Sequence, residues 1–404
     1  MIKPQTLKGF RDFLPADALK RQFVIGKIKE VFEQFGFDPL ETPALEYAET
    51  LLGKYGNEAD KLLYLFKDNG GRNVGLRYDQ TVPLSRVVAQ YQNKLPLPFK
   101  RYQIQPVWRA ENPQKGRFRE FLQCDIDTVG ADSPLADAEI ISCTLTAFKT
   151  LGFANPIMVI NDRRIFDDLG LSKKEIIILD KLEKIGNDAV AGELAASGTK
   201  DPNGLLTILR DTLPTERLAM IIAALERLGY VQGKDIRFNP FLARGLEYYT
   251  STIFEVKIPD YSGGSLAGGG RYDKLIGQFS GRGLPAVGIA FGFDRLLDAL
   301  EENHLLPATP TATQVLVTIF SPELVNNALR IAANLRTNGV NAEVFLEEIK
   351  LDKQLKYADR KGIPYVIIQG PEELQKNVVK LKDMKNQTQE ELTIEQITTR
   401  LQSS

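Results

Sequence analysis

Three arginines gather around one short loop of the sequence and have the chemistry of a phosphate site. Arg109, Arg117 and Arg119 flank this loop, and basic residues outnumber acidic ones around it. The planar guanidinium fork of arginine matches the oxygens of a phosphate group. If a strand continues through them, Arg109 and Glu111 point to the same side and into the same site. A solvated, salt-bridged hairpin is the simpler interpretation of this stretch taken alone.

A second candidate lies in residues 242–250, where Arg244, Tyr248 and Tyr249 interrupt an otherwise apolar stretch. Read as a strand, this stretch places Arg244 and Tyr248 on one face and Tyr249 on the other, unless Gly245 introduces a bulge. The alternative is that the tyrosines form a ladder that stabilises a sheet and takes no part in a reaction.

The glycine run at residues 268–270, just before Tyr272, indicates either a tight turn or a close backbone approach to a ligand. It has neither the spacing of the dinucleotide-binding glycine motif nor that of the phosphate-binding loop. We expect a glycine-rich turn over residues 263–270. Further along, Arg295 falls in the first turn of a helix that follows a buried strand.

Asp79 and Thr81 form a further candidate pair, because an acid beside a hydroxyl can hold an ammonium group. On a strand the two side chains would share a face. A turn or the N-cap of a helix is the alternative.

The elements that must position these residues follow from hydrophobic periodicity. Residues 18–35 form an amphipathic helix, and residues 37–48 are extended and interrupted by proline, as in an edge strand. Residues 99–108 and 118–129 predict a long antiparallel hairpin. Ser133 and a following proline start a helix over residues 134–151. Further strands are expected at residues 156–160, 236–238 and 246–256.

The domain organisation is predicted from changes in composition. Residues 1–310 form one domain, within which residues 162–235 lack strand signals and predict a helical insertion. One insertion helix begins at a capping box, Ser172 with Glu175, and is expected to end at Gly186. Residues 305–314 have the composition of a linker. Residues 315–404 alternate strand and helix, which predicts a small α/β domain.

Composition excludes several kinds of chemistry. The 404 residues carry 51 lysines and arginines against 52 acids, so bulk positive charge cannot hold a nucleic acid. The two cysteines have no metal-site spacing and suit a reducing compartment. The single histidine, His304, excludes histidine triads and histidine metal sites and is expected to be a solvated surface residue. No segment is apolar enough to span a membrane or act as a signal peptide, so we expect a cytoplasmic protein.

Taken in order, these segments resemble the class II aminoacyl-tRNA synthetases. Residues 37–46, 109–127 and 288–295 look like the three motifs of that class. Residues 242–250 and 267–273 look like the two segments specific to histidyl-tRNA synthetases, and residues 8–15 resemble the N-terminus of that family. The resemblance covers residues 5–385, but Asn112 stands where family members often have a basic residue.

The resemblance implies an α+β catalytic domain with a mixed, mainly antiparallel sheet flanked by helices, a helical insertion, and a C-terminal anticodon-binding-like domain. It implies ATP as a substrate, with Arg109 and Arg244 at the α-phosphate as the catalytic residues. The other implied ATP contacts are Glu111 at the adenine amino group, Phe121 on the adenine ring, and Arg117 and Arg295 at the outer phosphates.

The resemblance also implies how histidine is held. Asp79, Thr81 and Gln123 would bind its amine and carboxylate region. Asp127 and Tyr249 would bond the two imidazole nitrogens. Tyr248 and Tyr272 belong to the same pocket. Gln114 and Lys115 match the loop that meets the acceptor end of the tRNA.

The implied reaction joins L-histidine to ATP as an adenylate, releases pyrophosphate, and transfers histidine to the 3′ end of tRNA(His). Magnesium is implied with the ATP, with no metal site built from protein alone. A homodimer through the first motif is implied as well. The alternative is a catalytically silent relative, such as a regulatory subunit of histidine biosynthesis or a tRNA sensor. Residues 311–404 argue against it, because such subunits usually lack this domain. A synthetase for another amino acid, such as proline, disagrees with the segment from Arg244 to Tyr249.

Overall fold

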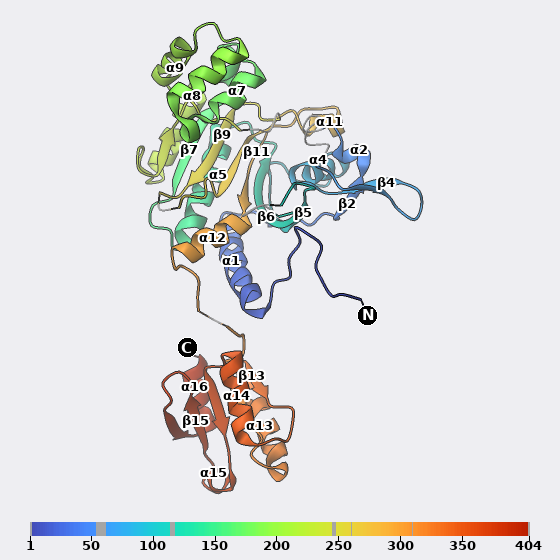
Figure 1. The fold of residues 1–404 in the computed structure, drawn as a ribbon, viewed down its shortest axis with the longest axis vertical. Helices are drawn as coiled ribbons and strands as arrows, with labels where there is room; N and C mark the ends of the chain where they lie inside the picture. Colours follow the sequence, from blue (N-terminus) through green and yellow to red (C-terminus); the bar gives the residue numbers. More distant parts are fainter. Residues whose placement is uncertain are drawn as a thin grey trace. The chain divides into compact units, whose positions relative to one another are not determined.

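The computed structural model describes residues 2–53, 62–113, 118–244, 248–259, 261–308 and 310–402. The chain divides into two compact units (Figure 1). Within the described residues, one contains residues 2–12 and 24–305, and the other contains residues 13–23 and 306–402. Each unit is described by itself.

An eight-stranded sheet forms the centre of the first unit, in the order β1-β5-β6-β11-β10-β9-β7-β8. All neighbouring strands are antiparallel except the pairs at the two ends, β1 with β5 and β7 with β8. In sheet order the strands are Asp38–Pro39, Phe99–Trp108, Glu120–Val129, Ala286–Gly292, Ala267–Arg271, Thr252–Lys257, Ile157–Asp162 and Ile236–Phe238. The predicted hairpin is the pair β5 and β6, and the proline-containing segment provides the edge strand β1.

Helices cover one face of this sheet. They are α1 (Pro15–Gln34), α5 (Pro134–Thr150) and α12 (Phe293–Glu302). Phe291 of β11 shows how they attach, because its ring lies 5.5 Å from that of Phe32 in α1 and 5.4 Å from that of Phe148 in α5. Ser133 caps α5 as predicted, accepting a hydrogen bond from the Leu135 backbone amide. The opposite face is left for other segments to cover.

Five helices lie between β7 and β8 in the chain, within the range predicted as the helical insertion, and α7, α8 and α9 cluster at one end of the unit (Figure 1). They are α6 (Arg164–Asp168), α7 (Lys173–Leu179), α8 (Leu182–Ser197), α9 (Pro202–Asp211) and α10 (Glu216–Arg227). The predicted capping box starts α7. The expected end at Gly186 is wrong, because α7 ends at Leu179 and Gly186 is a break of positive φ inside α8.

A three-stranded sheet, β2-β4-β3, precedes the hairpin in the chain. Its strands are Leu45–Tyr47, Asn73–Leu76 and Leu65–Lys67. The short helix α2 (Ala48–Leu51) follows β2, α4 (Thr81–Gln90) follows β4, and α11 (Gly277–Ser280) contacts α4.

The second unit is built on a five-stranded sheet, β13-β12-β14-β15-β16. Its elements in chain order are β12 (Val315–Val317), η1 (Pro322–Leu324), α13 (Val325–Thr337), β13 (Ala342–Val344), α14 (Leu351–Lys361), β14 (Tyr365–Ile368), α15 (Pro371–Gln375), β15 (Val379–Asp383), β16 (Gln389–Leu392) and α16 (Ile394–Gln402). The parallel pairs of β12 with β13 and β14 are the predicted α/β pattern. The antiparallel hairpin of β15 and β16 was not predicted.

Two local predictions fail in the first unit. Residues 267–270 are not a turn, because they lie in β10, a strand inside the central sheet. The strand expected over residues 246–256 begins only at Thr252. The predicted fold class is confirmed: a mixed, mainly antiparallel sheet flanked by helices, with a separate small C-terminal domain. No helix among the described residues has the length and apolar character needed to cross a bilayer.

Candidate active site

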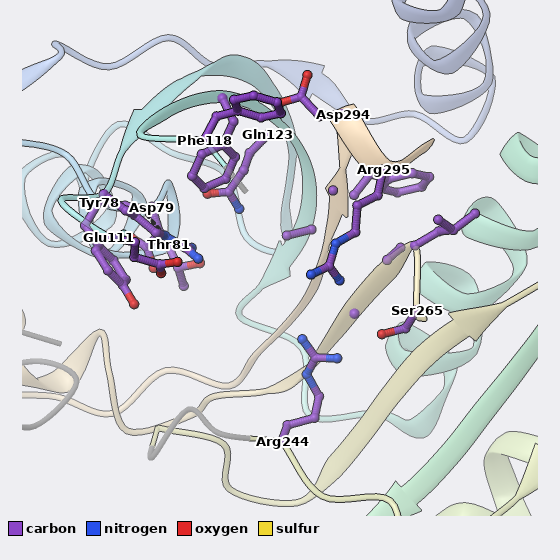
Figure 2. A pocket seen from close by; sticks show the side chains of 18 of the residues that line it. Tyr78, Asp79, Thr81, Glu111, Phe118, Gln123, Arg244, Ser265, Asp294 and Arg295 are labelled. Atoms are coloured by element: carbon purple, nitrogen blue, oxygen red, sulfur yellow. Dashed lines mark hydrogen bonds between the residues drawn. The ribbon is translucent and has the colours of Figure 1, made fainter. Parts of the chain in front are cut away.

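The first unit contains a cavity of about 520 Å³ against the uncovered face of the central sheet (Figure 2). Ten of the predicted site residues line it: Asp79, Thr81, Arg109, Glu111, Phe121, Gln123, Arg244, Tyr248, Tyr249 and Arg295. These residues come from positions far apart in the sequence, so the fold has brought the separate candidate segments to one place.

Small residues on the middle strands leave the space for this cavity. One row across the sheet reads Asp125, Ala290, Gly268 and Glu255, on β6, β11, β10 and β9 in turn. The neighbouring row pairs Asp127 with Gly288 and Gly288 with Gly270. A larger side chain at these β10 and β11 positions would project into the cavity or its floor. Of the two interpretations of the glycine run, the tight turn is wrong, and what approaches the run in the structure is the Arg244 side chain and the neighbouring strands.

Arg244 is the residue that approaches the glycine run. A Cβ built on Gly268 would lie 1.9 Å from Arg244 Nη1, so only glycine leaves room for the guanidinium. Nη1 is also 3.7 Å from Glu255 Oε2. Burial lowers the pKa of Arg244, but Tyr249 and Glu255 outweigh burial and the net shift is upward, so the group stays charged.

Arg109 lies on the opposite side of the cavity, just beyond the end of β5. Its guanidinium carbon is 4.4 Å from the ring centre of Tyr78 and 5.0 Å from that of Phe121. Its Nε donates to the Tyr78 backbone carbonyl at 3.3 Å. Two aromatic faces therefore hold this arginine at the cavity wall.

Asp79 and Thr81 line the cavity from the start of α4, not from a strand. Asp79 Oδ1 accepts a hydrogen bond from the Val82 backbone amide at 3.2 Å, so the helix-capping alternative holds. Gln123 faces the same space from β6. Its Nε2 is 3.4 Å from Asp125 Oδ1, and its buried Oε1 has no hydrogen-bond partner among the described residues. A buried acceptor without a partner is the kind of group that a ligand donor satisfies.

The structure does not place Asp127 and Tyr272 on the cavity lining. They lie behind it, where the Tyr272 hydroxyl donates to Asp127 Oδ1 and Arg101 Nη2 is 2.7 Å from Asp127 Oδ2. Tyr248 connects them to the cavity, because its ring packs edge-on at 5.9 Å from the ring of Tyr272. The ring of Tyr249 lies 4.7 Å from that of Tyr248. The expectation that these tyrosines face opposite ways is wrong, since residues 248–250 are not a strand and both rings line the cavity.

Several residues that line the cavity were not predicted from the sequence to belong to the site. Arg295 was expected, but its neighbour Asp294 also lines the cavity and pairs with Arg11 at 2.8 Å. The Arg11 guanidinium in turn lies 3.2 Å from the ring centre of Phe118, another lining residue. In Figure 2 the side chains of Arg244 and Arg295 point toward one another, apart from the group of Tyr78, Asp79, Thr81 and Glu111. Arg11 lies within residues 8–15, which resemble the N-terminus of a known family, but only spatial contact reveals that it reaches the cavity wall.

Three predicted residues, Gln114, Lys115 and Arg117, lie outside the residues that the structure describes.

The geometry agrees with comparisons to known proteins. Residues 9–296 match the family model for histidyl-tRNA synthetase, and residues 314–404 match that for an anticodon-binding domain. The chain belongs to the histidyl-tRNA synthetase family. A histidine–tRNA ligase of Cytophaga hutchinsonii is 38% identical over 453 residues, covering 99% of this chain and all of that protein. One of Rhodopirellula baltica is 40% identical and covers 95% of this chain and 94% of the relative.

Solved structures agree as well. The crystal structure of the histidyl-tRNA synthetase of Nostoc sp. PCC 7120 superposes with a TM-score of 0.86 at 31% identity, covering 99% of this chain and all of that one. The function of the chain is therefore that of a histidyl-tRNA synthetase, which ligates histidine to tRNA with ATP as a substrate.

Proposed function

We propose that the cavity forms histidyl-adenylate with Arg109 and Arg244 as the catalytic residues at the α-phosphate. Both line the same cavity from different segments, and Arg244 is held charged beside Gly268. The histidine carboxylate attacks the α-phosphorus and pyrophosphate leaves, so negative charge grows on the phosphoryl oxygens. Fixed guanidinium groups stabilise that charge, and no covalent enzyme intermediate is needed.

The other parts of ATP would bind the remaining residues that line the cavity. Glu111 accepts from the adenine amino group, and Phe121 offers a ring face to the base. For adenine to stack there, the Arg109 guanidinium, now 5.0 Å from that ring, shifts toward the α-phosphate. Arg295, with Arg117, holds the outer phosphates. The single observation that carries this assignment is the convergence of Arg109, Arg244 and Arg295 on one cavity.

Magnesium would accompany the triphosphate, whose oxygens are ligands that Mg²⁺ prefers. Within the described part of the chain, no three acidic, histidine or cysteine side chains gather to hold an ion by themselves. When bound, the ion would neutralise phosphate charge. The steps assigned here to the arginines do not depend on a metal held by the protein.

Histidine itself would lie between Gln123 and the tyrosines. Asp79 and the unpartnered Gln123 Oε1 are acceptors for its ammonium group, with Thr81 beside them. Its imidazole would reach inward to Asp127 and Tyr249, with Tyr248 and Tyr272 around the ring. Because Asp127 lies behind the lining, this step requires the tyrosine side chains at the cavity floor to part. A competitor that left the buried Asp127 without a donor would bind much more weakly.

Two partners remain proposals. The loop with Gln114 and Lys115 would meet the tRNA acceptor end, and residues 314–402 would read the anticodon. A homodimer would form through the three-stranded sheet, whose Leu45, Tyr47 and Phe66 are 44–53% exposed. Exposed apolar side chains of this size on one small sheet suit an interface. Sedimentation of the purified chain at micromolar concentration tests the dimer.

The decisive functional experiment is ATP–pyrophosphate exchange with each of the twenty amino acids, followed by charging of total tRNA. We expect exchange with histidine alone and charging of histidine-accepting tRNA alone. A folded protein without histidine-dependent exchange would support the catalytically silent alternative. Exchange driven by another amino acid would refute the assigned pocket.

A further inference from the structure

Arg101 is a fully buried residue behind the cavity, and the family resemblance assigns it no role. It lies on β5, directly across from Asp127 on β6, and its side chain is fully buried. Its Nη2 is 2.7 Å from Asp127 Oδ2. All three of its guanidinium nitrogens are buried and have no hydrogen-bond partner among the described residues, so Asp127 is held by charge. Burying a guanidinium that makes so few hydrogen bonds costs free energy of folding. A role in the function of the site would explain why Arg101 is nevertheless placed beside one carboxylate.

The surroundings of Asp127 supply that reason. Burial raises the pKa of Asp127, whereas Arg101 and the hydrogen bond from Tyr272 lower it. Asp125, on the same strand, is also buried and has its pKa raised well above the ordinary value, chiefly by burial. From β11 the facing residue is Gly288, where a Cβ would lie 1.9 Å from Asp127 Oδ1. Among the described residues, Arg101 is therefore the cation that lowers the pKa of both Asp125 and Asp127.

The charge state of Asp127 decides what it can bind. An ionised carboxylate only accepts hydrogen bonds, and its two oxygens have about four acceptor sites. The Tyr272 hydroxyl takes one of these sites on Asp127, while Arg101 faces Oδ2 as an ion pair and not as a hydrogen bond. A protonated carboxyl turns one oxygen into a donor and keeps only a neutral acceptor, which binds an imidazole N–H more weakly than a carboxylate does. Histidine's ring N–H is therefore held most tightly at this position when the carboxyl has lost its proton.

We propose that Arg101 is a positioning and specificity-determining residue that keeps Asp127 ionised, so that Asp127 accepts a hydrogen bond from an imidazole N–H of the bound histidine. The inference rests on the proposed function, in which Asp127 meets the imidazole ring. Arg101 itself touches no substrate and acts through Asp127. It thereby selects a substrate whose ring presents a proton at this point.

The test is histidine-dependent ATP–pyrophosphate exchange by the full-length chain between pH 6 and pH 9. Arg101→Met removes the charge and keeps much of the side-chain volume. At pH 7 we expect the histidine KM to rise about 10- to 100-fold, the effect of a lost hydrogen bond to a charged group. This ratio to wild type should shrink as the pH rises, because Asp127 of the variant then loses its proton. Titration of histidine itself is common to both proteins and cancels in the ratio.

Four further variants separate the possible causes. Arg101→Lys keeps a charge and should show the same trend with a smaller amplitude. Asp127→Asn should raise the histidine KM by a ratio that does not change with pH, and the double variant with Arg101→Met should behave like it. Arg217→Met is the matched control. Arg217 lies 2.9 Å from another fully buried carboxylate, that of Asp137, and its loss should add no pH dependence to the histidine KM.

The outcomes are distinct. A histidine KM ratio for Arg101→Met that stays constant with pH, while Asp127→Asn does raise the KM, would overturn the proposal and make Arg101 merely structural. If Arg101→Met does not fold, a flat ratio for Arg101→Lys with a raised KM would overturn it equally. A normal histidine KM in Asp127→Asn would instead refute the role of Asp127 in the proposed function.

Discussion

A single methyl group at Gly268 should disable catalysis by displacing Arg244. A Cβ at this position lies 1.9 Å from Arg244 Nη1, 2.3 Å from its Cζ and 2.5 Å from its Nη2. Ordinary van der Waals contact begins near 3.4 Å, so in Gly268→Ala the guanidinium must retreat by about 1.5 Å. The arginine keeps its charge and its neighbours but loses its position at the α-phosphate.

The expected magnitude follows from the size of that displacement. A misplacement of about 1 Å can cost about 10²-fold in rate, and loss of one charge-stabilising contact costs about 10²–10³-fold. We therefore expect kcat of histidine-dependent pyrophosphate exchange to fall about 100-fold in Gly268→Ala, and about as far in Arg244→His. The KM values for ATP and histidine should change much less, because the displaced contact acts mainly in the transition state.

A double-variant cycle makes the assay specific. Gly268→Ala combined with Arg244→His should be no slower than Arg244→His alone, because both changes remove the same contact. Gly192→Ala is the matched control, since a Cβ there meets nothing within 4 Å. Wild-type kcat in Gly268→Ala, or a double variant that multiplies the two losses, would refute the reasoning.

Three further predictions concern other parts of the molecule. Because burial raises the folded-state pKa of Asp127, stability from this group is greatest below its unfolded pKa and is lost as pH rises through the folded pKa. Arg101→Met raises that pKa further, so the loss in free energy of unfolding relative to wild type, measured with urea, should grow with pH to about 3–5 kcal/mol. This trend is opposite to that of the histidine KM ratio of the same variant. A loss that shrinks as the pH rises would contradict the prediction. Gly288→Ala, with its Cβ 1.9 Å from Asp127 Oδ1, should raise the histidine KM about tenfold or more in exchange assays and leave the ATP KM unchanged. Cutting the chain within residues 305–314 should leave exchange largely intact and weaken aminoacylation, and equal loss of both would contradict an anticodon-reading role for the C-terminal domain.

Much of the architecture could be predicted from local pattern. The hairpin of β5 and β6, the capping of α5 by Ser133 and the passage from β11 into α12 depend on side-chain alternation and on cap residues next to the element itself. The convergence of the arginines was also expected, but through resemblance to a family and not from spacing.

The failures have a common physical cause, which is tertiary contact. The glycine run was expected to turn, because three glycines in series have no side-chain preference for a strand. It lies in β10, where it pairs with β9 and β11 and where Arg244, Gly288 and Thr252 crowd it so closely that a Cβ would clash. Asp79 was weighed as a strand residue, but its carboxylate caps α4 and still faces the cavity.

Other site residues were invisible to sequence reasoning. Arg101 is one of two basic residues at the start of β5, and only the cross-strand register places it against Asp127. Arg11 and Asp294 form an ion pair although they are much further apart in the sequence than the residues of any motif. Long-range pairing of this kind depends on the fold as a whole, so composition and local periodicity contain no signal for it.

The central claim is that one cavity binds the adenylate of histidine with its phosphate between Arg109 and Arg244. A crystal structure of the chain with a non-hydrolysable sulfamoyl analogue of histidyl-adenylate measures this directly. The account predicts the sulfamoyl group in contact with both arginines, the adenine at Glu111 and Phe121, and an imidazole nitrogen within hydrogen-bond distance of Asp127. An analogue bound elsewhere, or bound in this cavity with Asp127 and either arginine out of reach, would contradict it.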